Sequence, residues 1–122
     1  MQPYTILVVE DDPIIRLDAV VLFEEAGFAV ADFATADAAA AFLGDRPEEV
    51  GAVFTDVNMP GQLDGLDLAA MIRARWPDIA VLVTSARYGE KPRVLPPEVM
   101  FISKPWLPLD LLVTMQQAAE AS

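Results

Sequence analysis

The sequence predicts an α/β fold in which helices cover both faces of a parallel β-sheet. Short, nearly all-apolar segments alternate with segments of helical spacing, and this alternation is typical of parallel strands joined by right-handed crossovers. Hydrophobic residues make up 54% of the 122 residues, as expected for strands that are buried on both faces. A chain of this length is typical of one domain, which we expect to comprise residues 1–122.

Five apolar, β-prone segments are expected to form the strands. They are residues 5–9, 28–33, 50–56, 79–84 and 99–102. The first helix should begin at Pro13, after the N-cap Asp12, because proline favours the first helical position. It should end at Gly27, since glycine favours the position after a helix. The residues expected to form its buried stripe are Ile15, Ala19, Leu22 and Ala26.

Three further helices are expected. The second is capped by Thr35 and runs to Leu43, with Gly44 as its stop. The third should comprise residues 65–75, because the residue before Pro77 leaves helical geometry. The last starts at Pro108. The residues expected on the inner faces of these last two helices are Leu68, Ala69, Ile72, Leu112, Met115 and Ala119.

The segment between the fourth and fifth strands departs from this alternation. A helix is expected there, yet residues 86–98 contain Gly89, Pro92, Pro96 and Pro97. Each interior proline destabilises a helix by about 3 kcal/mol. We therefore expect a loop or at most one or two turns, so that the fourth helix of such a fold is short or missing.

Composition excludes several classes of site. The chain has no cysteine and no histidine, so it has no disulfide or thiolate site and lacks the commonest general base. Its formal net charge of −11 disfavours binding to nucleic acid or to an anionic membrane. No apolar run approaches the roughly 20 residues of a membrane span, and the N-terminus lacks the basic region of a secretory signal. We expect a cytoplasmic protein.

Three carboxylates follow the strands at one edge of the predicted sheet. Glu10 and Asp11 follow the first strand, and Asp56 ends the third. The carboxyl ends of parallel strands form the ligand crevice of an open α/β sheet, so these side chains should converge. Two like charges about 4 Å apart repel by roughly 4 kcal/mol at an effective dielectric of about 20, so a cation or a proton must be present.

Oxygen ligands without histidine or cysteine favour Mg²⁺, with Mn²⁺ as a substitute. In the alternative interpretation, Glu10 and Asp11 only cap the first helix. Capping explains Asp12 well, but it does not explain three consecutive acids at the end of an apolar strand.

A lysine and a hydroxyl complete the same edge. Lys104 follows the fifth strand and precedes Pro105, and a cis bond between them would direct the lysine inward. Only about 5% of such bonds are cis in folded proteins. An ammonium facing the acids can neutralise a bound phosphoryl group, and the hydroxyl of Thr84 could bind the same oxygens. The alternatives are a solvated lysine and an ordinary β-branched strand residue.

In the order and spacing of these motifs, the chain resembles the receiver domain of two-component response regulators, over essentially its whole length. The matching segments are residues 7–12, 55–61, 83–86 and 101–105. The resemblance implies a flavodoxin-like, doubly wound, five-stranded parallel sheet of order 2-1-3-4-5, similar to a chemotaxis receiver. It also implies a phosphorylation-dependent signalling switch of a two-component system or phosphorelay, rather than an enzyme.

The resemblance implies a role for each residue at this edge. Asp56 would accept a phosphoryl group from a phosphohistidine of a sensor histidine kinase or histidine phosphotransfer protein. Thr84 and Lys104 would form the phosphoryl-binding switch pair, and Phe101 the aromatic switch. The implied Mg²⁺ ligands are Asp11, Asp56 and the backbone carbonyl of Asn58, with Glu10 holding a bound water.

The implied output is contact with an unidentified downstream protein, with a homodimer as a further option. The chain would be either a stand-alone regulator or a receiver from a hybrid kinase. Two features depart from the family pattern. The loop at residues 60–65 is one residue longer than usual, and the proline-rich segment alters the usual output surface.

Two other functions fit these residues less well. A Mg²⁺-dependent phosphohydrolase of the haloacid dehalogenase type would use Asp56 as its nucleophile, but it needs a second Asp where this chain has Asn58. A receiver-like scaffold that is never phosphorylated is disfavoured because Glu10, Asp11, Asp56, Thr84 and Lys104 are all intact.

Overall fold

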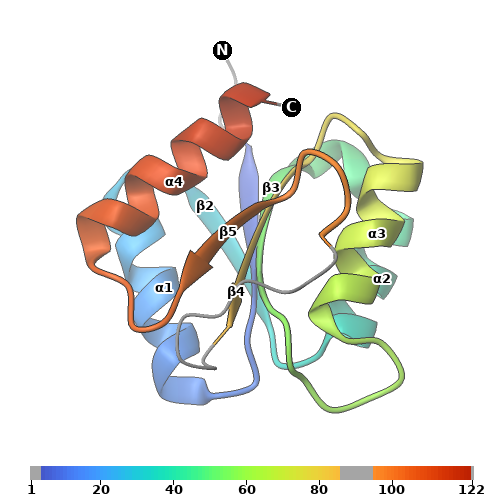
Figure 1. The fold of residues 1–122 in the computed structure, drawn as a ribbon, viewed down its shortest axis with the longest axis horizontal. Helices are drawn as coiled ribbons and strands as arrows, with labels where there is room; N and C mark the ends of the chain where they lie inside the picture. Colours follow the sequence, from blue (N-terminus) through green and yellow to red (C-terminus); the bar gives the residue numbers. More distant parts are fainter. Residues whose placement is uncertain (1–3, 86–94, 122) are drawn as a thin grey trace.

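In the computed structural model, which describes residues 4–85 and 95–121, five strands form one sheet of order β2-β1-β3-β4-β5 (Figure 1). The strands are β1 (Thr5–Val9), β2 (Ala29–Phe33), β3 (Val50–Asp56), β4 (Ala80–Ser85) and β5 (Met100–Ser103). All four neighbouring pairs are parallel. The predicted fold class and the implied sheet order are therefore confirmed.

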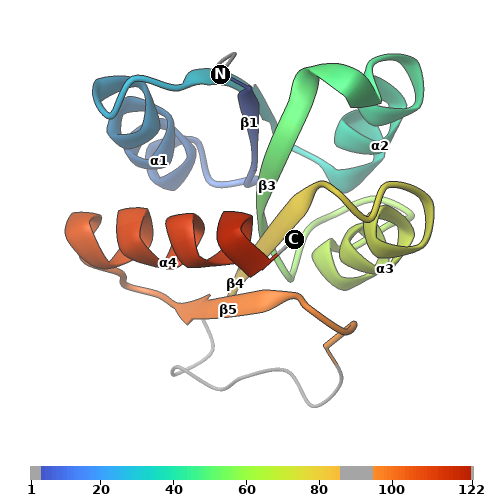
Figure 2. The ribbon, with the colours of Figure 1, turned by 90° about the horizontal axis from the view of Figure 1, so that it is seen from above.

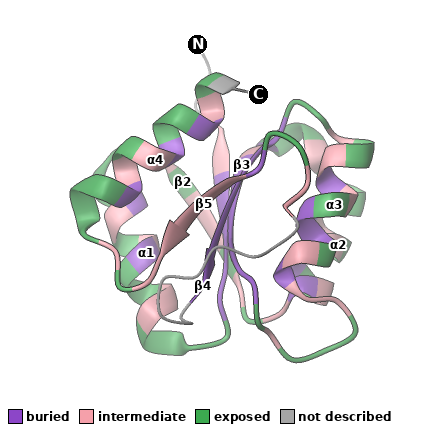
Figure 3. Cartoon of the chain, viewed as in Figure 1, coloured by how far each residue is buried: buried purple, intermediate pink, exposed green. Residues whose placement is uncertain are grey.

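Helices cover both faces of the sheet (Figure 2). One face carries α1 (Pro13–Glu25) and α4 (Pro108–Ala121), and the other carries α2 (Ala36–Asp45) and α3 (Gly65–Arg75). A short 3-10 helix, η1 (Pro47–Glu49), precedes β3. The central strands β1, β3 and β4 are almost completely buried between the two layers (Figure 3), which explains why their sequences are nearly all apolar.

The predicted helix starts are confirmed by their caps. The Asp12 carboxylate accepts hydrogen bonds from the N–H groups of Ile14 (2.9 Å) and Ile15 (3.3 Å). Thr35 caps α2, and Asp64 begins α3 in a capping box with Asp67. These side chains satisfy backbone donors that have no partner within the helix, which is why α1, α2 and α3 start where they do.

Several predicted boundaries were wrong by one or two residues. Gly44 does not end α2, which continues to Asp45, because the backbone of Gly44 stays out of the left-handed region that a glycine stop requires. Gly27 does adopt that conformation, with φ of 99°. The strands β4 and β5 each begin and end one residue later than predicted, and β2 begins one residue later.

The buried stripes of two helices were also partly wrong. On α1, Phe23 is fully buried, while the predicted Leu22 is half-buried and Ala26 is exposed. Phe23 lies four residues after the buried Ala19, so it lies on the same face. The stripe on α4 is displaced by one residue from the predicted Leu112 and Ala119, which are half-buried. The buried residues of α4 are Leu111, Met115 and Ala118.

The prediction for residues 86–98 falls mostly on 86–94, which lie outside the described residues. Residues 95–98 form loop and turn, so the described part of the connection between β4 and β5 contains no helix. Within the described ranges, no helix is both long and apolar enough to cross a membrane.

Candidate functional site

The candidate site lies where the carboxyl ends of four strands meet. Glu10 follows β1, Asp56 is the last residue of β3, Thr84 lies near the end of β4, and Lys104 follows β5. In the ladder between β3 and β4, Asp56 lies directly opposite Thr84. The parallel topology therefore brings together residues that are widely separated in the sequence.

An acidic cluster forms the floor of this site. One carboxylate oxygen from each of Glu10, Asp11 and Asp56 lies within 4.8 Å of the other two. Glu10 is 3% exposed and Asp56 is 6% exposed, whereas Asp11 faces solvent. The convergence predicted from the strand ends is confirmed, and the cluster is open to solvent on the side of Asp11.

Lys104 faces this cluster from the opposite side. The peptide bond between Lys104 and Pro105 is cis, as the sequence suggested. The Lys104 Nζ lies 2.5 Å from Glu10 Oε1 and 3.4 Å from Asp56 Oδ2, and only 10% of its side chain is exposed. Lys104 is therefore an inward-facing partner of the acids rather than a solvated surface lysine.

The charges in the site are not balanced. Burial raises the pKa of both Glu10 and Asp56 above the usual carboxyl range, although the nearby Lys104 opposes the rise. Burial alone would lower the pKa of Lys104, but its hydrogen bond to Glu10 and the charge of Asp56 outweigh burial and raise it. Three carboxylates thus share one ammonium, and burial disfavours the ionised forms of Glu10 and Asp56.

Two buried oxygens in the site have no hydrogen-bond partner among the described residues. They are Asp56 Oδ1 and Thr84 Oγ1. Buried polar atoms are normally paired, so unpaired oxygens beside an acidic cluster are typical of a ligand site. An all-oxygen donor set with excess negative charge fits a hard divalent cation. The cluster of Glu10, Asp11 and Asp56 could therefore bind a metal ion.

The other two predicted site residues are Asn58 and Phe101. Asn58 is exposed in the loop after β3, and Phe101 is half-buried in β5, where it pairs with Val83 and packs against the core on the side of α2 and α3. Their implied roles remain predictions.

Three residues that support the site were not predicted from the sequence as part of it. The Arg16 guanidinium donates to the Glu10 carbonyl, and the Asp37 carboxylate accepts from the N–H groups of Gln62 and Leu63. At Gly65, an added Cβ would lie only 1.8 Å from the Asp56 carbonyl oxygen. The pair Asp64-Gly65 was predicted only as a helix start, and the long-range contact of Asp37 leaves no local signal in the sequence.

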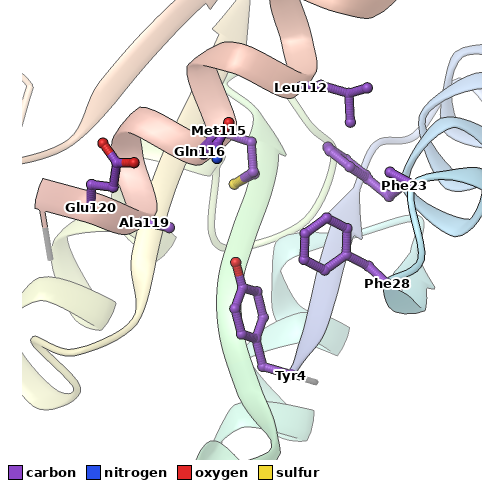
Figure 4. Close-up of a pocket in the computed structure, with 9 residues that line it drawn as sticks. Tyr4, Phe23, Phe28, Leu112, Met115, Gln116, Ala119 and Glu120 are labelled. Atoms are coloured by element: carbon purple, nitrogen blue, oxygen red, sulfur yellow. The ribbon is translucent and has the colours of Figure 1, made fainter. Parts of the chain in front are cut away.

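An apolar cavity of about 630 Å³ lies elsewhere, between α1 and α4 (Figure 4). Tyr4, Phe23, Phe28 and Met115 point into it. Tyr4 immediately precedes β1, so this cavity lies at the amino edge of the sheet, opposite the acidic cluster. None of the candidate site residues lines it.

Comparisons with known proteins agree with the geometry. Residues 6–116 match the sequence profile of the response regulator receiver domain. The chain is 34% identical, over 96% of its length, to the hydrogenase transcriptional regulatory protein HoxA of Cupriavidus necator. It is 31% identical, over 95% of its length, to the sensor kinase CckA of Brucella abortus. It spans only 24% of the first protein and 12% of the second.

Solved structures have the same fold. A response regulator receiver protein from Sinorhizobium medicae superposes with a TM-score of 0.86 at 24% identity. The match covers 98% of this chain and 97% of that one.

Proposed function

This chain belongs to the response regulator receiver domain family, and we propose that it is a phosphorylation-dependent switch with Asp56 as its phosphoacceptor. The donor is a phosphohistidine on a sensor histidine kinase or a histidine phosphotransfer protein. The domain is a signalling domain rather than an enzyme with a free substrate. It assists the formation and the hydrolysis of its own aspartyl phosphate.

The acidic cluster is proposed as a Mg²⁺ site, in which Mn²⁺ can substitute. The proposed holders are Glu10, Asp11, Asp56 and the backbone carbonyl of Asn58. Thr84 and Lys104 bind the phosphoryl oxygens, and Phe101 responds to the movement of Thr84. The inward-facing Lys104, whose Nζ lies 3.4 Å from Asp56 Oδ2, supports this assignment.

In the proposed transfer, an oxygen of ionised Asp56 attacks the phosphorus of the phosphohistidine. A P–O bond forms as the P–N bond breaks, and the imidazole, protonated on its other nitrogen, leaves as a neutral molecule with the bonding electrons. The Lys104 ammonium and the Thr84 hydroxyl hold the phosphoryl oxygens during this step. A bound Mg²⁺ would offset the negative charge that the carboxylates and the phosphoryl group share.

One observation supports the proposal above the others. Asp56 presents a buried oxygen without a partner, opposite an equally unpartnered Thr84 hydroxyl, and its second oxygen lies 3.4 Å from an ammonium. A structural aspartate would be fully paired in such a place. The arrangement suits a nucleophile whose ligands arrive together with its substrate.

Intact-protein mass spectrometry tests the assignment. Incubation with Mg²⁺ and acetyl phosphate should add the mass of one phosphoryl group to the wild-type chain. Asp56→Asn should gain none, whereas Asp78→Asn, a change in an exposed turn before β4, should gain it as the wild type does. Phosphorylation of the Asp56→Asn variant would remove Asp56 from this role.

The wider setting is also proposed. Residues 1–122 form one receiver domain, either alone or as part of a longer regulator or hybrid kinase, since the relatives named above are longer than this chain. We place the domain in the cytoplasm of a bacterium, with output through contact with a downstream protein or a second copy of itself. Its net charge of −11 argues against direct contact with nucleic acid or a membrane surface.

A further inference from the structure

Arg16 forms a clamp beside the acidic cluster. From the first turns of α1, its Nη1 donates to the carbonyl oxygen of Glu10 at 2.8 Å, and its Nε donates to Asp32 Oδ2 at 3.0 Å. Asp32 lies in β2, next to Val8 of β1. One guanidinium, only 22% exposed as a side chain, therefore ties α1, the end of β1 and β2 together.

Arg16 holds the backbone of Glu10, the residue that connects β1 to the acidic cluster. Glu10 lies one residue beyond β1, and its N–H donates to the carbonyl oxygen of Phe33 at 3.0 Å. Because β2 ends at Phe33, the strand offers no further N–H group to the Glu10 carbonyl. Arg16 donates to this carbonyl instead. Both backbone groups of Glu10 are thus held, while its side chain reaches the N–H of Asp12 and Lys104.

The direction of the next residue, Asp11, depends on this anchored backbone. Asp11 is the exposed member of the cluster and follows Glu10 directly. It is also followed by Asp12, whose own position is set by capping α1. Metal sites need their ligands held in place, and loss of an outer-shell partner typically weakens metal binding by 10–100-fold.

We propose that Arg16 is a positioning residue, which fixes the β1–α1 loop so that Glu10 and Asp11 converge with Asp56. Asp32 orients the guanidinium for this contact. The inference rests on the proposed function, because it concerns the Mg²⁺ affinity of the same site. The positioning depends on the forked shape of the Arg16 guanidinium rather than on its charge. A lysine cannot donate to both Asp32 and the Glu10 carbonyl in one plane.

A second arginine provides a matched control. The Nη1 of Arg73 donates to the carbonyl oxygens of Pro77 (2.8 Å) and Ile79 (3.3 Å), and its Nη2 pairs with the carboxylate of Glu98. This clamp has the same chemistry, but it lies near the end of α3 and the start of β4, at the amino edge of the sheet. It should matter for stability without affecting the acidic cluster.

Isothermal titration with Mg²⁺ alone tests the inference on three purified variants, with thermal denaturation of each metal-free protein in parallel. Arg16→Lys, which keeps the charge, should weaken Mg²⁺ binding by about tenfold. Asp32→Ala should weaken it in the same direction. Arg73→Lys should lower the melting temperature by an amount comparable to Arg16→Lys, yet bind Mg²⁺ within about twofold of the wild type.

Two results would overturn the inference. If Arg16→Lys and Asp32→Ala bound Mg²⁺ like the wild type, Arg16 would not position the cluster. If Arg73→Lys weakened Mg²⁺ binding as much as Arg16→Lys does, the effect would be general destabilisation. Failure of the proposed function looks different, because the wild-type chain itself would then not bind Mg²⁺.

Discussion

At the scale of single residues, the main feature is an excess of buried negative charge around one lysine. Glu10 and Asp56 are both buried, and Lys104 makes its shorter contact with Glu10. Ionisation of these two buried acids therefore destabilises the metal-free protein, as is common at functional sites.

Asp56→Asn should stabilise the metal-free protein at neutral pH. The change removes a buried charge and leaves the closer pair of Lys104 with Glu10 intact. We expect the free energy of unfolding to rise by about 1 kcal/mol, the usual size of a single-site effect, in urea denaturation with EDTA present. A clear loss of stability would mean that Asp56 and Lys104 form a net stabilising pair.

The same charges predict a pH dependence. Burial raises the folded-state pKa of Asp56 and Glu10 above the unfolded values, so the folded protein binds protons more readily than the unfolded chain. Their favourable contribution is complete below the unfolded pKa values and is lost as the pH rises through the folded ones. The stability advantage of Asp56→Asn over the wild type should therefore shrink as the pH of metal-free samples is lowered from neutral to about 4, the ordinary pKa of an aspartate.

An advantage that stayed constant, or grew, over this range would contradict the raised pKa of Asp56. Saturating Mg²⁺ provides the control, because a bound cation should favour ionised carboxylates and remove the pH dependence.

At the scale of elements, the start of α3 is fitted directly against the end of β3. The N–H of Gly65 donates to the carbonyl oxygen of Val57 at 2.8 Å, and there is no room for a side chain at Gly65. The residue after Asp56 is thus hydrogen-bonded to the start of α3 and to β4, and Gly65 lies directly against the Asp56 carbonyl.

Gly65→Ala should therefore disturb both the fold and the site. The new methyl group would meet the carbonyl oxygen and carbon of Asp56, so we expect a loss of about 2 kcal/mol in unfolding free energy. The rate of phosphorylation by acetyl phosphate should fall as well. Gly44→Ala is the matched control, because Gly44 lies within α2 with nothing near its missing Cβ.

Alanine at position 44 should stabilise the protein by up to about 1 kcal/mol, since it is a better helix former than glycine. Equal effects of the two substitutions, measured by denaturant unfolding, would show that α3 does not constrain Asp56 in the proposed way.

Elements were more predictable from sequence than their buried faces. Caps such as Asp12 and Thr35 are local signals, and they located the helix starts correctly. The prediction that Leu22 rather than Phe23 is buried was wrong. Several residues of α1 are apolar, and only the tertiary contact with Phe54 determines that Phe23 is the buried one. The predicted end of α2 at Gly44 was wrong because a glycine inside a helix cannot be told from a glycine that ends one by local sequence alone.

At the scale of the whole molecule, topology assembles the site. The order β2-β1-β3-β4-β5 puts the ends of β1, β3 and β4 side by side, with β5 next to β4. Glu10, Asp56 and Lys104 were predictable because strand ends in a parallel sheet must meet at one edge. Arg16 was not, since its partner Asp32 is 16 residues away and only the packing of α1 against the sheet joins them.

The most direct test of the account locates the phosphoryl group on the wild-type chain. Phosphorylation with acetyl phosphate and Mg²⁺, followed by borohydride reduction and peptide mass spectrometry, should convert residue 56 alone. The conversion should disappear when EDTA replaces Mg²⁺. Reduction at any other aspartate or glutamate, or labelling that is indifferent to Mg²⁺, would contradict the assignment of Asp56 as a metal-assisted phosphoacceptor.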